Sequence, residues 1–303
     1  MINNNLVLIF FSISALISLL FFFKLNSIAS YLNIYDQSDD ERKMHEKKIP
    51  PIGGLIFFFV FTLYILVIFF GYESSIFNHQ KHILSLFATS LFIFLTGLID
   101  DKNNLSSRRK TIIFIFLISI LVLNDNELLI YFLRFLTFDK TLALGNSSIV
   151  FTILCIFIFM NAFNMYDGIN LQSGLYSSTI FFFFIYKGIE PILFIPLLLT
   201  SLIFLIYNYK DKIFLGNCGS YFLSFVISAF IIKSYIKLSV ISIEEILVIM
   251  IIPGLDLVRL FCTRLVNGKS PFNADRNHIH HLLSNKFGNL KTVSIIFLIT
   301  FIP

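Results

Sequence analysis

Long apolar runs recur along the whole chain and leave little choice of fold. A helix that crosses a bilayer needs about 20 apolar residues, and ten runs near that length alternate with polar stretches. They cover residues 6–23, 51–72, 82–99, 111–124, 148–166, 169–186, 189–207, 219–237, 243–262 and 291–303. Backbone groups inside a bilayer must be hydrogen-bonded within the protein, so each run predicts a helix. The sequence therefore predicts an all-α, polytopic transmembrane bundle, with residues 1–303 forming a single integral membrane domain.

A few segments fit this scheme less simply. The apolar piece LLIYFLRFLTF at 128–138 is too short to cross a membrane alone, so it is predicted to be interfacial or a kinked continuation of the preceding span. The last run reaches Pro303 after 13 residues and is expected to stop within a span. The first run lacks a basic region and a cleavage site, which favours a span over a signal peptide. The three cysteines lie far apart, in or beside spans, which argues against a disulfide framework.

The distribution of positive charge predicts the orientation. With these spans, 17 of the 23 Lys and Arg residues fall in loops on one side. By the positive-inside rule these loops face the cytoplasm and the amino terminus lies outside. The net charge of +5 is then explained by topology and gives no indication of nucleic-acid binding.

Each of the five loops on the basic side carries a polar cluster, whereas the outer loops contain nothing comparable. The clusters are ERKMHEKKIPPIGG (41–54), LIDDKNNLS (98–106), NAFNMYDGINLQSG (161–174), YKDKIFLGNCGS (209–220) and PFNADRNHIHHLL (271–283). Polar groups at bilayer depth cost several kcal/mol unless they line a cavity. Five clusters on one face therefore predict a shared active site.

The residue types in these clusters suit a metal ion and phosphates. Asp100 and Asp101 are adjacent, and Asn161, Asn164 and Asp167 would line one side of a helix. Such an oxygen-rich set favours a hard cation such as Mg²⁺. The glycine turn before Ser220 offers backbone amides to an anion. Donors for phosphate come from a larger basic set, namely Arg42, Lys43, Lys47, Lys48, Arg264, Arg276, His278, His280 and His281.

The three histidines also raise the alternative of a zinc site. However, their i, i+2, i+3 spacing does not place three imidazoles on one helix face, and no matching cysteine pair is present.

The clusters together resemble the polyprenyl-phosphate N-acetylhexosamine-1-phosphate transferases, a membrane family that includes the translocase of peptidoglycan lipid synthesis. The matching stretches occur in the family's order and cover nearly the whole chain. They are RKMHEKKIPPIGG, the Asp100–Asp101 pair with Leu105–Ser106, NAFNMYDG, KIFLGNCGS and PGLDLVRLFCTRLVNGKSPFNADRNHIHHLL.

The resemblance implies that a UDP-amino sugar and a polyprenyl (undecaprenyl) phosphate react to give a polyprenyl-diphosphate sugar and UMP. It implies a requirement for Mg²⁺, for which Mn²⁺ can substitute, and a multi-pass location in the bacterial inner (plasma) membrane. The HIHHLL ending is more similar to members that use simple N-acetylhexosamines, which initiate cell-surface glycans. The sequence leaves homodimer formation open.

The resemblance also assigns roles to individual residues. Asp100 and Asp101 match the catalytic acidic pair, which is also expected to help hold the metal, together with Asn164 and Asn217. The expected substrate-binding residues are Arg42, Lys43, His45, Asn161, Asp167, Asn208, Arg264, Arg276, His278, His280 and His281.

Three positions depart from the family's pattern. Asn217 stands where the family usually has a metal-binding aspartate, so the site loses one negative charge. Residues 169–172, Ile-Asn-Leu-Gln, replace a second Asp-Gly pair, and Lys210–Asp211 replace Pro-Ala. A divergent active enzyme is the favoured interpretation. The alternatives are a catalytically impaired membrane scaffold and a transporter, which would place Asp256 and Arg259 near its substrate.

Overall fold

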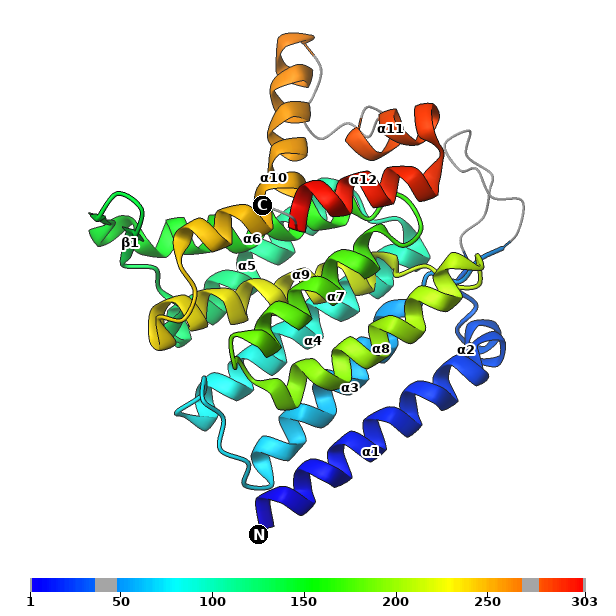
Figure 1. Ribbon diagram of the computed structural model, residues 1–303, viewed down its shortest axis with the longest axis horizontal. Helices are drawn as coiled ribbons and strands as arrows, with labels where there is room; N and C mark the ends of the chain where they lie inside the picture. The colour runs from blue at the N-terminus through cyan, green and yellow to red at the C-terminus, as the bar shows by residue number, and fades with distance from the viewer. Residues whose placement is uncertain (1, 36–47, 269–277, 302–303) are drawn as a thin grey trace.

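The structure of the protein is a computed structural model that describes residues 2–35, 48–268 and 278–301. Each of the ten predicted spans contains a helix, and the chain order is visible in Figure 1. The helices are α1 (Ile2–Phe23), α2 (Leu25–Leu32), α3 (Gly53–Phe69), α4 (Gln80–Asn103), α5 (Ser107–Asn124), α6 (Ser148–Tyr166), α7 (Gln172–Tyr186), α8 (Pro191–Tyr209), α9 (Gly216–Lys233), α10 (Ile243–Val266), α11 (Ile279–Phe287) and α12 (Asn289–Phe301).

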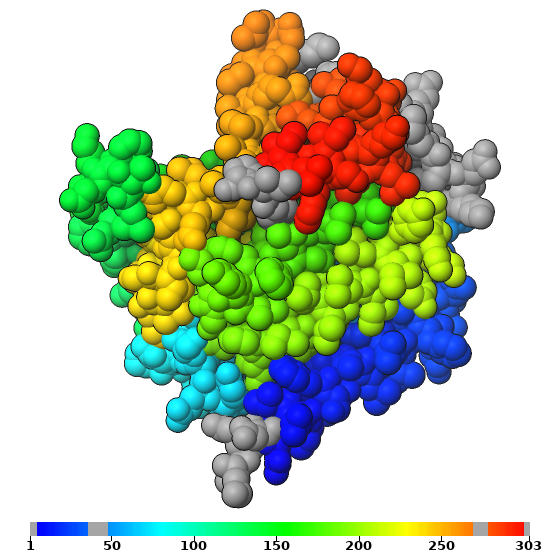
Figure 2. Space-filling view, viewed as in Figure 1, coloured from blue at the N-terminus to red at the C-terminus, as the bar shows by residue number. Residues whose placement is uncertain are grey.

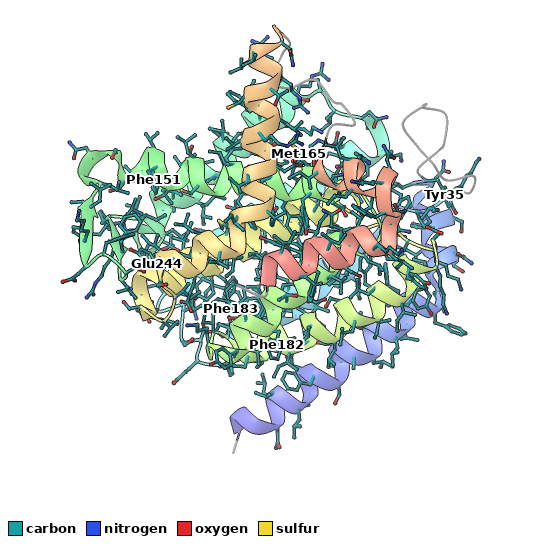
Figure 3. The ribbon with its side chains drawn as sticks, turned by 45° about the horizontal axis from the view of Figure 1, so that its top comes forward. Tyr35, Phe151, Met165, Phe182, Phe183 and Glu244 are labelled. Atoms are coloured by element: carbon teal, nitrogen blue, oxygen red, sulfur yellow. The ribbon has the colours of Figure 1, made fainter. Side chains whose placement is uncertain are left out.

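The apolar lengths of these helices match a bilayer. Within the described residues, six are long and apolar enough to cross one, namely α1, α4, α6, α8, α9 and α10, while α3 and α12 are shorter apolar helices. Large apolar side chains remain on the outer surface, such as Phe182, which is 60% exposed on α7 (Figure 3). Such a surface suits contact with lipid. The chain is a multi-pass membrane protein.

Helix α9 forms the centre of the bundle, where α3, α4 and α6 pack around it. Every residue from Cys218 to Lys233 is buried. Glycines allow this close approach: Gly54 packs directly on Gly219, and a methyl group on Gly97 would lie 2.5 Å from Cys218 Cα. The amino-terminal end of α9 is thereby pressed between the start of α3 and the end of α4.

Small hydroxyl side chains join neighbouring helices within the apolar interior. Ser18 on α1 and Thr200 on α8 lie 2.9 Å apart, and Ser178 on α7 and Ser201 on α8 lie 2.8 Å apart. Hydrogen bonds of this kind are used between helices in a bilayer, where apolar packing alone discriminates weakly. The cysteines Cys155, Cys218 and Cys262 are free thiols, as the sequence predicted.

The apolar segment 128–138 forms neither a helix nor a continuation of α5. Asn126–Leu128 makes a 3-10 turn, and strand β1 (Phe132–Phe135) pairs antiparallel with β2 (Lys140–Ala143). This hairpin projects from one end of the bundle (Figures 1 and 2). Glu244, at the start of α10 (Figure 3), accepts a hydrogen bond from the Thr137 amide and fixes the hairpin loop.

Helix α10 changes direction near its middle, as Figure 1 shows, so that its second half stands out from the bundle. Pro253 lies inside the helix, and a proline removes one backbone hydrogen bond and kinks the axis. The first half packs on α6, and α12 packs against α10 and α11. The bend brings Asp256 beneath the segment that begins α11.

Candidate active site

Segments from all five predicted polar clusters meet at the end of the bundle opposite the hairpin (Figure 1). The amides of Gly53 and Gly54 each donate to carbonyls just before α9, at Phe214 and Leu215, over 2.9 Å. Side-chain contacts described below connect the ends of α4, α6 and α10 to the same place. The described parts of the five clusters converge there. Five of the candidate residues, Arg42, Lys43, His45, Lys47 and Arg276, lie outside the described residues.

Asp101, in the last turn of α4, caps the amino-terminal end of α9. Its Oδ1 accepts a hydrogen bond from the Asn217 amide at 2.8 Å and its Oδ2 accepts one from the Cys218 amide at 2.9 Å. Unpaired amides and the helix dipole make a helix amino terminus favourable for negative charge. The Asp101 carboxylate therefore fixes α9 relative to α4 and brings its own charge to the site.

Asp100 faces a different set of donors, although it is the next residue. Its Oδ1 accepts from the Leu105 amide at 2.7 Å and its Oδ2 pairs with Lys110 Nζ at 2.8 Å. The side chain is 3% exposed and that of Lys110 is 19% exposed. The two adjacent acids thus sit in distinct environments, one against an ammonium and one against a helix amino terminus, which reduces the cost of holding both charges together.

Asn164 and Asn217, predicted as metal ligands, contact each other directly. Asn164 Nδ2 donates to Asn217 Oδ1 at 2.8 Å and to Ser220 Oγ at 2.7 Å. Within the described residues, Asn164 Oδ1 and Asn217 Nδ2 make no hydrogen bond. The pair therefore leaves one oxygen acceptor and one amide donor for a ligand. Asn161, one turn earlier, donates to its own helix at Phe157 O.

The loop between α6 and α7 carries Asp167 into the same region. Asp167 accepts a hydrogen bond from the Ser173 hydroxyl, and burial raises the pKa of its carboxyl to about 6, although the Ser173 bond opposes the shift. The carboxyl is therefore mainly ionised at neutral pH. Asn208 holds this loop in place, because its Oδ1 accepts from the Leu171 amide at 2.7 Å while its Nδ2 donates to Ile213 O at 2.8 Å.

Asp256 organises the histidine loop. Its Oδ2 lies 2.9 Å from His278 Nδ1, and its Oδ1 accepts from the Ile279 amide at 3.1 Å and from Arg259 at 2.8 Å. The His278 ring stacks on the His280 ring, with centroids 5.3 Å apart. An aspartate on α10 therefore orients the start of α11.

His280 lies behind this pair, against the loop of Asp167. Its Nε2 is buried beside Gly168, where any side chain larger than hydrogen would clash with the imidazole. Burial, and then the charges of His281 and His278, lower the pKa of His280 to about 3. The ring is neutral at physiological pH. The ring centroid of His281 lies 4.3 Å from that of His280. Arg264 on α10 is buried.

Comparisons with known proteins identify the family of the chain. The sequence profile of glycosyl transferase family 4 matches residues 83–235, which run from α4 into α9 and its carboxyl-terminal extension. The chain is 30% identical over 285 residues to the probable undecaprenyl-phosphate N-acetylglucosaminyl 1-phosphate transferase of Bacillus subtilis, covering 91% of this chain and 76% of that protein. The chain belongs to glycosyl transferase family 4.

Two further relatives in the family carry a similar name. The undecaprenyl-phosphate alpha-N-acetylglucosaminyl 1-phosphate transferase of Thermotoga maritima is 30% identical over 258 residues, which is 85% of this chain and 75% of that protein. The Escherichia coli K12 protein of the same name is 27% identical over 299 residues, covering 93% and 76%.

The oxygen donors of this family member fit a magnesium ion. Asn164 Oδ1 is free of hydrogen bonds within the described residues, and a carboxylate that accepts one bond per oxygen keeps further lone pairs. Asp100, Asp101, Asn164, Asn217 and Asp167 would supply these oxygens. Mg²⁺ combines one or two carboxylates with substrate phosphates rather than an all-protein cage, so this donor set is sufficient.

Asp256 is the site residue that sequence reasoning assigned elsewhere. It was assigned a role only as a partner of Arg259 in a transporter, and that ion pair does exist. Its contact with His278 spans 22 positions and depends on the bend in α10. The sequence signals were its place in the family-matching stretch that begins at Pro253 and an acid within an apolar helix, which predicts a partner but does not identify it.

Proposed function

We propose that the protein transfers N-acetylglucosamine 1-phosphate from UDP-N-acetylglucosamine to undecaprenyl phosphate, giving undecaprenyl-diphosphate-N-acetylglucosamine and UMP. The observation that supports this most is the convergence of the paired acids, the α9 amino terminus, the Asn164–Asn217 pair and the histidine loop in a family member. An anion-binding helix terminus, metal-suited oxygens and histidines are the groups that two phosphorylated substrates require.

In the proposed reaction an oxygen of the lipid phosphate attacks the β-phosphorus of the sugar nucleotide. A new P–O bond forms to that phosphorus, and its bond to the oxygen shared with the α-phosphate breaks. UMP leaves with the bonding electron pair. Phosphoryl transfer depends mainly on positioning and on charge neutralisation, so the protein needs to hold two anions in line.

The site residues suit a division of these tasks. Asp100, paired with Lys110, is the residue proposed to accept a proton from the lipid phosphate. Asn217 Nδ2 offers a donor to a phosphate oxygen. The neutral His280 and the Asp256-bound His278 line the opposite side, where the sugar or the diphosphate would bind.

Magnesium is the proposed cofactor, with Mn²⁺ as a substitute, held by the oxygen donors described above. It would neutralise the negative charge that accumulates on the diphosphate as the bond to UMP breaks. Because Asn217 contributes no charge, Asp100, Asp101 and Asp167 carry all of the protein's negative charge in this set.

We place the protein in the bacterial inner (plasma) membrane, with the site on the cytoplasmic side. The support is the distribution of Lys and Arg, which favours the loops at the site end of the bundle. This orientation gives a water-soluble nucleotide sugar and a membrane-bound lipid phosphate access to the same site.

The direct test uses membranes or purified protein with undecaprenyl phosphate, Mg²⁺ and a panel of labelled UDP-amino sugars. We expect a chloroform-extractable labelled lipid with UDP-N-acetylglucosamine, equimolar UMP, and loss of both products with EDTA. Absence of product with every sugar in the panel would contradict the proposal, provided that a cooperative thermal denaturation shows the protein to be folded.

The Asp256→Asn variant is expected to lower kcat about 10- to 100-fold, a range typical for the residue that orients a functional histidine. The amide keeps the volume and an acceptor for the Ile279 amide, but it presents a donor to His278 Nδ1 and so selects the other tautomer. The measurement is kcat and KM across pH 5.5 to 9. A changed pH profile would indicate an effect on His278 rather than on folding.

The control for Asp256→Asn is Arg259→Gln, which removes the arginine from the carboxylate and leaves the bonds to His278 and the Ile279 amide in place. It should keep the wild-type pH profile. If Asp256→Asn behaves as wild type in rate and pH dependence, the orienting role is refuted.

The Asn217→Asp variant is expected to keep or raise activity and to lower the Mg²⁺ concentration needed for half-maximal rate by about tenfold, since ligand charge tunes metal affinity. A carboxylate at this position keeps the acceptor for Asn164 Nδ2 and adds one negative charge. The measurement is the initial rate as a function of Mg²⁺.

Asn146→Asp is the matched control, because it adds the same charge at an exposed position just before α6, at the opposite end of that helix from Asn164. It should leave the Mg²⁺ dependence unchanged. A Mg²⁺ requirement that is unaltered by Asn217→Asp, or altered equally by both variants, would show that Asn217 does not lie at the metal.

A further inference from the structure

A second polar cluster lies at the opposite end of the bundle, near the hairpin, where the sequence predicted nothing comparable to the active-site loops. It consists of His82 in the first turn of α4, Asp125 and Glu127 after α5, and Lys233 at the end of α9. His82 and Asp100 lie on the same helix, 18 residues apart, which corresponds to about 27 Å at 1.5 Å per residue. The cluster is therefore separate from the active site.

The cluster is largely inaccessible to water. The side chains of Asp125 and Lys233 are 0% and 1% exposed, and that of His82 is 14% exposed. Their residues come from three helices that are distant in sequence. Burying charged groups is costly unless they are paired or bind a cation, so such an arrangement calls for a specific compensation.

The geometry around His82 is unusual for an ion pair. His82 Nδ1 lies 3.3 Å from Asp125 Oδ1 and 3.5 Å from Glu127 Oε2, and within the described residues this buried atom makes no hydrogen bond. Hydrogen bonds between nitrogen and oxygen are normally 2.7–3.2 Å long. In contrast, two ligands bound tetrahedrally to one zinc ion, at bond lengths near 2.05 Å, lie about 3.3 Å apart.

The charges in the cluster leave room for a cation. Lys233 Nζ pairs with Asp125 Oδ2 at 2.7 Å and with Glu127 Oε2 at 3.2 Å, so a single lysine faces two carboxylates. With a neutral imidazole the four side chains carry a net charge of −1.

Two neighbouring charged groups offset each other. Glu190 is held by Tyr64, Ser74, Ser75 and the Ile76 amide. The charge of Lys237 acts on Asp125 and Glu127, but its ammonium donates to Ile76 O at 2.7 Å and, within the described residues, bonds to neither carboxylate. Glu127 also contacts Asn78 Nδ2 at 3.4 Å, and its amide donates to Asp125 Oδ1 at 3.1 Å.

We propose that His82 Nδ1, Asp125 Oδ1 and Glu127 Oε2 form a binding site for a zinc-like divalent metal ion. One imidazole nitrogen and two carboxylate oxygens are ligands that suit Zn²⁺ better than Mg²⁺ or Ca²⁺. Lys233 holds the other oxygen of Asp125 and so orients that ligand. A fourth position is open to water or to the exposed His79, whose ring centroid lies 5.2 Å from that of His82.

The expected effect of the metal is on stability rather than on catalysis. It would join the start of α4, the end of α5 and the end of α9, the central helix of the bundle. Ions that bind the folded protein and not the unfolded chain raise the unfolding temperature, and the stabilisation grows with the logarithm of their concentration relative to the dissociation constant. This inference does not rest on the proposed enzymatic function.

The test is metal binding by the purified full-length protein in detergent, after treatment with a chelator. Titration with Co²⁺ should give the visible absorption of a tetrahedral site, one equivalent of Zn²⁺ should abolish that absorption, and Zn²⁺ should raise the unfolding temperature. His82→Gln should lose that equivalent, with Zn²⁺ affinity at least about 100-fold weaker, because removing a partner that only orients a ligand already costs 10- to 100-fold.

Two variants make the result decisive. His82→Gln keeps both carboxylates and the Lys233 ion pair, so its fold is expected to persist, and its helical circular dichroism and a single symmetric peak in size-exclusion chromatography report that it does. His278→Gln removes a histidine from the Asp256–His278–His280 cluster at the other end of the bundle, which also has metal-ligand spacing. This variant should still bind the one equivalent of Zn²⁺ that His82→Gln loses. Equal Zn²⁺ stoichiometry and equal stabilisation in wild type and His82→Gln would overturn the proposal, as would loss of the metal only in His278→Gln.

Discussion

Asp100→Asn is expected to lower the rate of sugar-phosphate transfer by at least about 1000-fold, the upper end of what one preorganised polar group contributes. The amide keeps the shape of the carboxylate and an acceptor for the Leu105 amide, but it removes the negative charge that faces Lys110 at 2.8 Å. Of the two adjacent acids, Asp101 is bonded to the amino terminus of α9, whereas Asp100 is not, which makes Asp100 the candidate for the proton acceptor. The measurement is the initial rate of UMP release at saturating substrates.

A double variant separates chemistry from stability. Asp100→Asn leaves Lys110 without its partner, and an unpaired charge in a mostly buried position is strongly destabilising. The Asp100→Asn/Lys110→Met protein removes both charges, so its thermal stability should recover towards wild type while its activity stays low. Recovery of activity in the double variant would show that Asp100 serves only to neutralise Lys110.

Asp101→Asn is expected to cost about 100- to 1000-fold in rate and about 1–3 kcal/mol in the free energy of unfolding. Its two oxygens accept hydrogen bonds from the Asn217 and Cys218 amides, and an amide side chain can accept only one of them. The change also removes a negative charge from the α9 amino terminus. Because α9 carries Asn217 and Ser220 into the site, both positioning and charge are affected.

The informative combination is Asp101→Asn with Asn217→Asp, which restores a negative charge near the site without restoring the double cap. We expect the rate of sugar-phosphate transfer to stay low in this combination. A wild-type rate in Asp101→Asn, or full recovery in the combination, would mean that the cap on α9 is not needed and that only the total charge matters.

Most of the fold could be predicted because apolar length is a strong signal in a membrane protein. Each apolar run became a helix, and the polar residues that ended those runs came together at one end of the bundle. The segment 128–138 was the exception. Its apolar run is too short for a helical or strand periodicity to distinguish a helix from a strand. The pairing of Phe132 with Ala143 also depends on a turn at Asp139.

The site residues were identifiable by type, but their partners were not. Nothing local indicates that Asn164 donates to Asn217, 53 positions away, or that the two adjacent acids face different donors. Short polar loops on the basic side drew attention to one end of the bundle. The His82 cluster escaped notice because its members lie in the terminal turns of helices, singly, rather than in one conspicuous loop.

The proposed reaction moves a sugar phosphate, not a sugar alone, to the lipid. Its test supplies UDP-N-acetylglucosamine labelled with ³²P in its β-phosphate, together with undecaprenyl phosphate and Mg²⁺. We expect the label in the extracted lipid and unlabelled UMP as the released nucleotide. Label that stays with the nucleotide as UDP, while the lipid gains the sugar, would refute transfer of the sugar phosphate.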